Sequence, residues 1–544
     1  MRAVLIGLLA LPFAVVAAPQ EAAPVPEPTA AAEASFVSPY VEKGLPTDAM
    51  RPMLIDPALA ANVKNNKRLW IGDIMRIGLY SRMRGEFRDN LNFSDANTQK
   101  IDRFLETSQI WFLVNPTKDA EIKVTVQDAR VWGGDGGAKT GDDRAAFFNN
   151  GDAMTKSSLG VREAYVQFRN VAIAGLGIQL GRQVLNYGDG RMIGSANWTF
   201  GGLSYDGFLI KYDNDLLSSH LFGVKGTSST ANNVPNGGVT NTSPAQGDSY
   251  LAGLYNTVKT EMAWLDLYAI GLFRQGAVDT VCAAGVTGCT SADVIIASAT
   301  LPTQRSNLYT LGARLTNRND NNKLPAGKRF DFTLETAFQA GNAADVIYTD
   351  ASGSATKSRT YAGQLYFAQA GYKVFDDLRA GVQAFYTPGT SDRTGSTIDT
   401  FQTLPGPRFG GFPYLNTFNG ISENMGMKNL FSPSVSLYYE GGKWGDFLVN
   451  YFYEMKATPQ DAWYAISGVA NTGASSESAT NSKTGLTRNL YQEIDLVWMK
   501  QFSTYFSIWI GVGYLHAGDA IAAARGGDFK ADAFMSFIQL SGAL

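Results

Sequence analysis

The feature that most constrains this chain is a repeated alternation of polar and apolar side chains. In residues 76–88, "RIGLYSRMRGEFR", the even positions carry the charges and the odd positions are mostly apolar. A period of two places successive side chains on opposite faces of a β-strand. We count about eighteen such segments, centred near residues 78, 109, 125, 165, 179, 209, 220, 252, 268, 311, 334, 366, 382, 436, 450, 495, 510 and 537.

The connections between these segments alternate between short turns and long polar loops. Short turns include "NPTKDA", "DND", "VFDD" and "EGGKWGD", whereas long loops lie near 133–158, 184–204, 225–248, 275–305, 341–359, 387–430, 457–488 and 516–530. Transmembrane barrels have short periplasmic turns and long extracellular loops, and closure satisfies their backbone hydrogen bonds within lipid. We therefore predict an all-β fold, a closed antiparallel transmembrane β-barrel of about 18 strands. A barrel of this size has a bore too wide for its side chains to fill.

The N-terminus has the pattern of a secretory signal peptide. Arg2 precedes the apolar run "AVLIGLLALPFAVVA", and the small residues of "VVAA" predict cleavage after Ala17 or Ala18, with Pro19 favouring Ala17. No later run of 18 apolar residues predicts a membrane helix. We expect a signal peptide at 1–17, a Pro/Ala/Glu-rich periplasmic linker or N-terminal segment at 18–67, and the barrel at 68–544. Residues 36–67 form either a short periplasmic segment or a small plug. An exported barrel belongs in the outer membrane of a Gram-negative bacterium, in contact with lipid and lipopolysaccharide.

The charge pattern predicts what lines the bore. A net charge of −3 gives no basic footprint for nucleic acid. The strand period directs eleven basic side chains inward: Arg76, Arg82, Arg84, Arg88, Lys123, Arg169, Lys211, Arg274, Arg314, Arg379 and Lys456. It also directs nine acidic side chains inward: Glu86, Glu121, Glu163, Asp266, Asp331, Glu335, Glu454, Glu493 and Asp495. The bore as a whole is therefore not strongly basic, but four arginines on the first strand predict one electropositive wall. These charges either select ions or only keep the bore wet and pair across strands.

A glycine-rich stretch, "LGRQVLNYGDGRMIGSANWTFGGLSYDG" at 180–207, occupies the third long loop and the strand ends on both sides of it. Neither this stretch nor "GGDGGAKTGDD" at 133–143 opens a helix, and the Gly-Lys-Ser/Thr of a phosphate-binding loop is missing. Both stretches are therefore interpreted as external loops rather than nucleotide sites.

Four segments resemble the alginate-export family of outer-membrane proteins. They are "LGRQVLNYGDGRMIGSANW" with the following "YDGFLIKYD", "DTFQTLPGPRFGGFPYLNTFNGISENMGMKNL" at 399–430, "DAWYAISG" at 461–468, and "EIDLVWMKQFSTYFSIWIGVGYLHAGD" at 493–519. The resemblance covers about residue 68 to the end. It implies an eighteen-stranded monomeric barrel, and the family's type case passes an anionic polysaccharide through an arginine-rich lumen. One departure is the C-terminus, which ends in Leu544 rather than an aromatic residue, although Phe537 could serve instead.

The resemblance also suggests a constriction formed by the third long loop. Arg182 and Arg191 match the family motif, and Asp189 and Asp206 could pair with either arginine. The strand period places Arg182 on the lipid face unless a bulge turns it inward. We interpret these four residues as a candidate constriction loop that folds into the bore.

The leading hypothesis is passive passage of an anionic polysaccharide or oligosaccharide, with periplasmic export partners in that case. The alternatives are an uptake porin for small organic anions or other small solutes, and a barrel used chiefly for adhesion through its loops. With only two histidines, His220 and His516, far apart in the sequence, we expect no enzyme.

The remaining predictions concern bound groups. Cys282 and Cys289 are expected to form one loop disulfide in an oxidising compartment. No metal or cofactor is expected. Calcium at "TNRNDNNK", 316–323, is conceivable, but the EF-hand spacing is missing, so a solvated turn is preferred.

Overall fold

The computed structural model describes residues 70–543, apart from positions 73, 94–99, 133–158, 196–197, 199–200, 228–248, 277–278, 283–294, 298–303, 319–326, 351–352, 393–394, 405–418, 465–486, 504 and 526–531. The predicted signal peptide and linker therefore lie outside the described residues. Within the described part, no helix is long and apolar enough to span a membrane.

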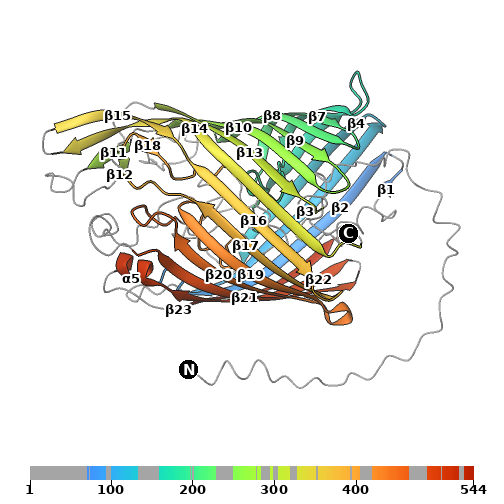
Figure 1. The fold of residues 1–544 in the computed structure, drawn as a ribbon. Coiled ribbons are helices and arrows are strands. Elements are labelled where there is room, and N and C mark those ends of the chain that lie inside the picture. Colours follow the sequence, from blue (N-terminus) through green and yellow to red (C-terminus); the bar gives the residue numbers. More distant parts are fainter. Residues whose placement is uncertain are drawn as a thin grey trace. The chain divides into compact units, whose positions relative to one another are not determined.

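Eighteen antiparallel strands form a closed barrel (Figure 1), as the sequence predicted. In chain order they are β2(Met75–Asp89), β3(Lys100–Thr117), β4(Ala120–Trp132), β5(Gly160–Phe168), β6(Leu176–Gln183), β7(Tyr205–Asp213), β8(Leu217–Thr227), β9(Ser249–Lys259), β10(Trp264–Gly276), β13(Gln304–Thr316), β14(Phe330–Asp350), β16(Gln364–Lys373), β17(Leu378–Thr387), β19(Leu430–Glu440), β20(Asp446–Lys456), β21(Asn489–Ser503), β22(Phe506–Ala517) and β23(Asp532–Ala543). Each strand pairs with the next, and β23 pairs with β2 from Tyr80↔Ala543 to Asp89↔Phe534. This pairing closes the sheet and leaves no open edge among the barrel strands.

The alternating pattern divides each strand between the two faces of the barrel wall. On β2, Arg82 and Arg84 are buried inside the barrel, whereas Leu79 and Met83 are exposed on the outer surface. Aromatic side chains line up on the outer face near both ends of the strands. The extracellular row is Phe338, Tyr366, Tyr386 and Phe431, and the periplasmic row on β21–β22 is Trp498, Phe502 and Phe506. Such rows mark the two membrane interfaces of an outer-membrane barrel.

Some residues predicted to be loops form strands beyond the barrel wall. β14 pairs with β16 over Phe330–Phe338 and then with β15(Gly353–Tyr361) from Gly341 onward. The predicted polar loop at 341–359 is therefore largely a hairpin. Gly341, with φ of +126°, lies where β14 changes partner. Four short strands, β1(Trp70–Ile71), β11(Asp279–Cys282), β12(Ile295–Ala297) and β18(Thr397–Ile398), and the helices η4(Gly442–Trp444) and α5(Asp519–Arg525) complete the described elements.

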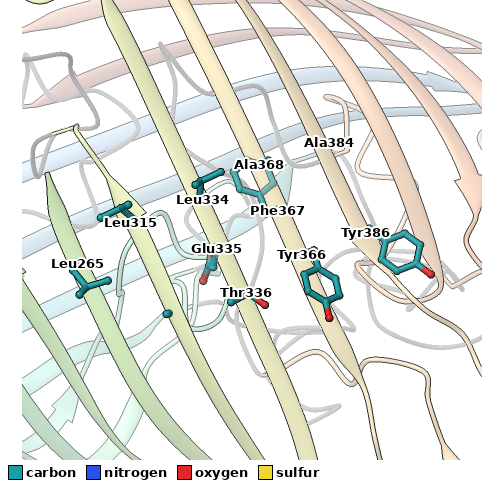
Figure 2. A pocket seen from close by; sticks show the side chains of 11 residues that line it. Leu265, Leu315, Leu334, Glu335, Thr336, Tyr366, Phe367, Ala368, Ala384 and Tyr386 are labelled. Carbon is teal, nitrogen blue, oxygen red and sulfur yellow. The ribbon is translucent and has the colours of Figure 1, made fainter.

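The outer wall carries an apolar hollow with a volume of about 440 Å³ (Figure 2). Ala313, Ala368 and Ala384 contribute small side chains, and Leu334 and Tyr366 stand at its sides. Leu334 and Tyr366 are exposed on the outer surface of the barrel. The hollow therefore belongs to the lipid-facing surface and not to the path through the bore.

Candidate functional site

Strands β2–β5 form a basic wall inside the barrel, which we define by Arg76, Arg82, Arg84, Arg88, Arg103, Lys123 and Arg162. The described inward residues of these four strands include only three carboxylates, those of Glu86, Glu121 and Glu163. The wall therefore carries an excess of positive charge, which in a confined pore acts on passing ions at close range.

Carboxylates on the same strands partly neutralise the positive charge of the basic wall. Glu86 forms ion pairs with Arg84 at 2.8 Å, with Arg88 at 3.1 Å and with Arg103 at 2.6 Å. Lys123 pairs with Glu163 at 2.5 Å. Arg82 donates instead to the neutral Thr107 Oγ1 at 3.3 Å, and Arg76 stacks 5.1 Å from the Trp111 ring.

The loop at 184–204 crosses the bore and reaches the basic wall. The Trp198 carbonyl accepts from Arg84 at 3.0 Å, and the indole ring lies 4.0 Å from the same guanidinium. Trp198 also packs edge-on against Phe537 of β23, with ring centroids 5.2 Å apart. Phe537 therefore faces the bore and cannot replace a C-terminal aromatic residue at the membrane interface.

Arg162 of β5 anchors the C-terminal half of the 184–204 loop to the barrel wall. Its guanidinium donates to the Ser195 carbonyl and to Ser204 Oγ, both at 3.1 Å. Gly202, with φ of +60°, lies so close that an added Cβ would meet Arg162 Nη2 at 2.5 Å. The sequence pattern missed Arg162 because β5 is bulged against β4 near Thr125, so Arg162 and Glu163 are both buried inside.

The other end of the loop is fastened to the opposite wall. Asp189 pairs with Arg191 at 3.2 Å and with Arg314 of β13 at 3.1 Å. Arg191 also pairs with Glu335 of β14 and lies 3.6 Å from the Phe367 ring. Burial of the Asp189 carboxyl opposes its ionisation, but Arg191 and Arg314 outweigh burial and lower its pKa to about 2. Asp189 therefore stays ionised in any neutral medium.

The two other residues of the predicted constriction lie elsewhere. Arg182 and Asp206 form a bidentate ion pair at 2.8 Å on the outer surface, with 44% and 57% of their side chains exposed. Arg182 follows the same outward period as Leu180, which is also exposed. The assignment of Arg182 and Asp206 to the constriction is thus corrected, because β6 and β7 keep their period to the base of the loop.

The remaining residues that were predicted to line the lumen lie at different positions along the axis of the bore. Lys211 is buried, with Nζ 3.5 Å from Gln167 Oε1, and Arg379 is buried with Nε 2.6 Å from Asp331. Arg169 lies in the periplasmic turn after β5 and reaches in to pair with Glu121. Arg318, in the turn interpreted as solvated, is instead buried against Asp331 at 3.0 Å. Residues 319–323, which complete the candidate calcium turn, lie outside the described residues.

A second loop, 388–429, also enters the bore. Among its described residues, Lys428 donates to Gln402 Oε1 at 3.2 Å and lies 4.5 Å from the Tyr464 ring. Burial, together with the charge of Arg274, lowers the pKa of the Lys428 ammonium to about 8 although Asp461 is near.

Both loops share one apolar cluster with the extracellular ends of the strands. Its loop members include Tyr187, Ile193, Met425 and Met427, and Ile521 of α5 joins them. Three of its rings, Tyr187, Tyr255 and Tyr268, stack at centroid separations of 4.6 Å and 5.3 Å. The extracellular half of the bore is therefore narrowed by loops that pack like a protein core.

Several neutral polar groups in the bore make no hydrogen bond within the described structure. They are Gln179 Oε1, Gln183 Nε2, Gln369 Oε1, Ser436 Oγ, Gln539 Oε1, the Trp111 indole N–H and both amide atoms of Asn450. A buried polar group without a partner costs about 1–3 kcal/mol. Such groups need water or a hydroxyl-bearing solute, so the bore is chemically suited to hydrated, hydrogen-bonding cargo.

The two histidines do not build a catalytic arrangement. His220 Nε2 lies 3.3 Å from both Ser218 Oγ and Asp213 Oδ1, so one ring nitrogen faces both groups. A triad needs the hydroxyl and the carboxylate on different nitrogens. His516 lies 3.7 Å from Asp532 in an exposed position. Cys289 lies outside the described residues, so its disulfide with Cys282 stays a prediction.

Known proteins share this architecture. The chain is similar to OccAB1 of Acinetobacter baumannii, with 11% identity and a TM-score of 0.50, over 86% of this chain and 96% of that one. It is also similar to the outer membrane protein OprD of Pseudomonas aeruginosa, with 10% identity and a TM-score of 0.47, over 86% and 93% of the two chains. At these identities the likeness concerns the fold alone. A search of curated protein sequences found no significant match.

The family comparison covers most of the chain. A sequence model of the alginate export family matches residues 74–533, which include all of the barrel strands except β23, of which only the first two residues are covered. The role that describes this family is alginate export, which is transport. The barrel therefore lies in the outer membrane of a Gram-negative bacterium, and the chain belongs to the alginate export family.

Proposed function

We propose that this protein is a passive channel for acidic, hydroxyl-rich solutes, with an anionic polysaccharide or its oligosaccharides as the cargo. The observation that carries the proposal is the basic wall, which faces the bore where Trp198 brings the 184–204 loop onto Arg84. Arg76, Arg82 and Arg84 are almost fully buried, so the wall acts on a carboxylated sugar chain in the bore through its positive field.

The neutral side chains of the bore support the same cargo. Gln183 Nε2, Gln539 Oε1 and both amide atoms of Asn450 can each exchange water for a sugar hydroxyl. A bore that bound its cargo only through charge would need no such groups. Family membership is consistent with the proposal but does not fix the polymer or the direction of transport.

A second candidate is uptake of small organic anions. It is favoured by the narrowing of the extracellular half, where loops 184–204 and 388–429 share an apolar cluster. A narrow opening admits a small anion more readily than a hydrated polymer. Both candidate functions use the basic wall, because both cargoes are anionic. The size of the solute that passes therefore distinguishes the two functions, and its charge does not.

The test is current block in single-channel recordings. Oligouronates of increasing length, neutral oligosaccharides of matched length and benzoate are added to either side of the reconstituted protein. The proposal expects oligouronates to interrupt the current at lower concentration than neutral sugars, with dwell times that grow with chain length. Block by benzoate with no effect of oligouronates would favour the second candidate. Equal block by acidic and neutral sugars would remove the role of the basic wall.

A further inference from the structure

The bore contains an acidic patch, which we define as Glu454 of β20 and Glu493 and Asp495 of β21. All three side chains are fully buried inside the barrel. An open patch of three carboxylates would attract cations and repel the anions that the proposed function requires. The structure shows how the patch is covered.

The cover is a short segment of the 388–429 loop, residues 420–422, which we call the tip. The Ser422 backbone N–H donates to Glu493 Oε1 at 3.0 Å, and the Ser422 hydroxyl donates to Oε2 at 2.6 Å. The Ile421 backbone N–H donates to Asp495 Oδ2 at 3.1 Å. Glu454 accepts from Ser432 Oγ of β19 at 2.9 Å. The carboxyl oxygens of the patch thus receive hydrogen bonds from neutral donors of the loop and of β19.

The tip fits closely against this part of the wall. Gly420 adopts φ of +83°, and an added Cβ would lie 2.2–2.4 Å from the Glu493 carboxylate. Ile421 is fully buried in an apolar cluster with Trp198 of the other loop. On β22, Gly513 leaves the room that Ile421 needs, because a Cβ there would meet the Ile421 side chain at 3.1 Å. Backbone shape, apolar packing and hydrogen bonds all place residues 420–422 over the acidic patch.

We propose that residues 420–422 are a specificity determinant that covers the acidic patch, so that its carboxylates do not act on permeating ions. The inference rests on the proposed function in that it assumes ion passage through this bore. It assigns a role in selectivity to a loop segment that itself carries no charge.

The experiment measures reversal potentials in a salt gradient at low ionic strength. In Gly420→Ala the added methyl group clashes with the Glu493 carboxylate and strains the backbone at φ of +83°, which separates residues 420–422 from the patch, and the anion-to-cation permeability ratio should fall severalfold. Ser422→Ala removes one of the two donors to Glu493 without adding bulk, so a smaller fall in the same direction is expected. Gly327→Ala is the matched control, because Gly327 also has a positive φ, +76°, but nothing lies within 4 Å of its Cβ position. It should leave the ratio unchanged.

A double variant that removes two carboxylates of the acidic patch completes the test. Glu493→Gln with Asp495→Asn should keep the wild-type ratio while the tip is intact, and should restore it when combined with Gly420→Ala. The proposal is overturned if Gly420→Ala leaves the ratio unchanged, if its shift persists after neutralisation, or if neutralisation alone strongly favours anions. A wild-type channel without anion preference would refute the proposed function. A shift in Gly420→Ala that neutralisation reverses would still support the cover in that case.

Discussion

Replacing Arg82 and Arg84 by Gln should weaken anion preference, because both side chains face the bore from the middle of β2. Each is at most 2% exposed, and neither lies on the lipid side. Gln keeps polar side chains at both positions, so the strand pairing of β2 with β3 and β23 has no reason to change. After the change Glu86 retains Arg88 and Arg103 as partners, which limits the disturbance to the loss of two charges.

The expected size follows from Coulomb's law with screening. A monovalent ion about 8 Å from one charge in water-like surroundings gains or loses about 0.5 kcal/mol before screening. With a Debye length of about 30 Å at 0.01 M salt, two charges shift the difference between anion and cation by about 1.6 kcal/mol, or roughly 15-fold in the permeability ratio. At 0.15 M the same arithmetic gives about 4-fold, and at 1 M it gives about 1.3-fold.

The assay is the reversal potential of reconstituted channels at these three salt concentrations. The matched control is Arg182→Gln, which removes an arginine from the outer surface, where it pairs with Asp206. The double variant should lose anion preference most at low salt, and the control should not. If selectivity at 0.01 M is unchanged in the double variant, the basic wall only hydrates the bore and the proposed function loses its physical support.

Three further predictions use different measurements. Cysteine at position 82 or 84 should react with a hydrophilic thiol reagent in the Cys282/Cys289-free protein, whereas cysteine at 83, which faces lipid, should not; equal labelling would contradict the strand register. Mass spectrometry without reduction should find one peptide linked through Cys282 and Cys289, and two alkylatable thiols in the exported protein would refute the disulfide. Because burial lowers the pKa of Lys428 to about 8, its positive charge is present below that pH and lost above it. Anion preference should therefore fall between pH 7 and 9 in the wild type and stay level in Lys428→Gln.

The barrel could be predicted because the sequence pattern that specifies it, the alternation of polar and apolar residues, is local. Each strand repeats one rule, polar inward and apolar outward, and a rule of period two is visible in any window of a few residues. Arg76, Arg82 and Arg84 were placed inside by this rule, and Met83 was placed outside, as the structure has them. The number of strands followed from the same rule.

The site was less predictable because its parts depend on breaks in that rule. Arg162 is buried inside because a bulge shifts the register of β5, and a bulge leaves no reliable mark in a single sequence. Arg103 sits on a strand with weak alternation and was recognised only through its contact with Glu86. Arg182 was assigned to the constriction through a motif, although its own period pointed outward.

Loop contacts were hidden for a different reason, since they join residues far apart in the chain. Trp198 reaches Arg84 across 114 positions, and Ser422 reaches Glu493 across 71. Nothing in the local sequence around Ser422 announces a carboxylate partner. The strands fix charges on a rigid wall, and the loops then decide which of those charges a passing solute can reach. Two family members with the same inward charges could therefore differ in selectivity through their loop tips alone, so comparison of lumen charges between members must include the 420–422 positions.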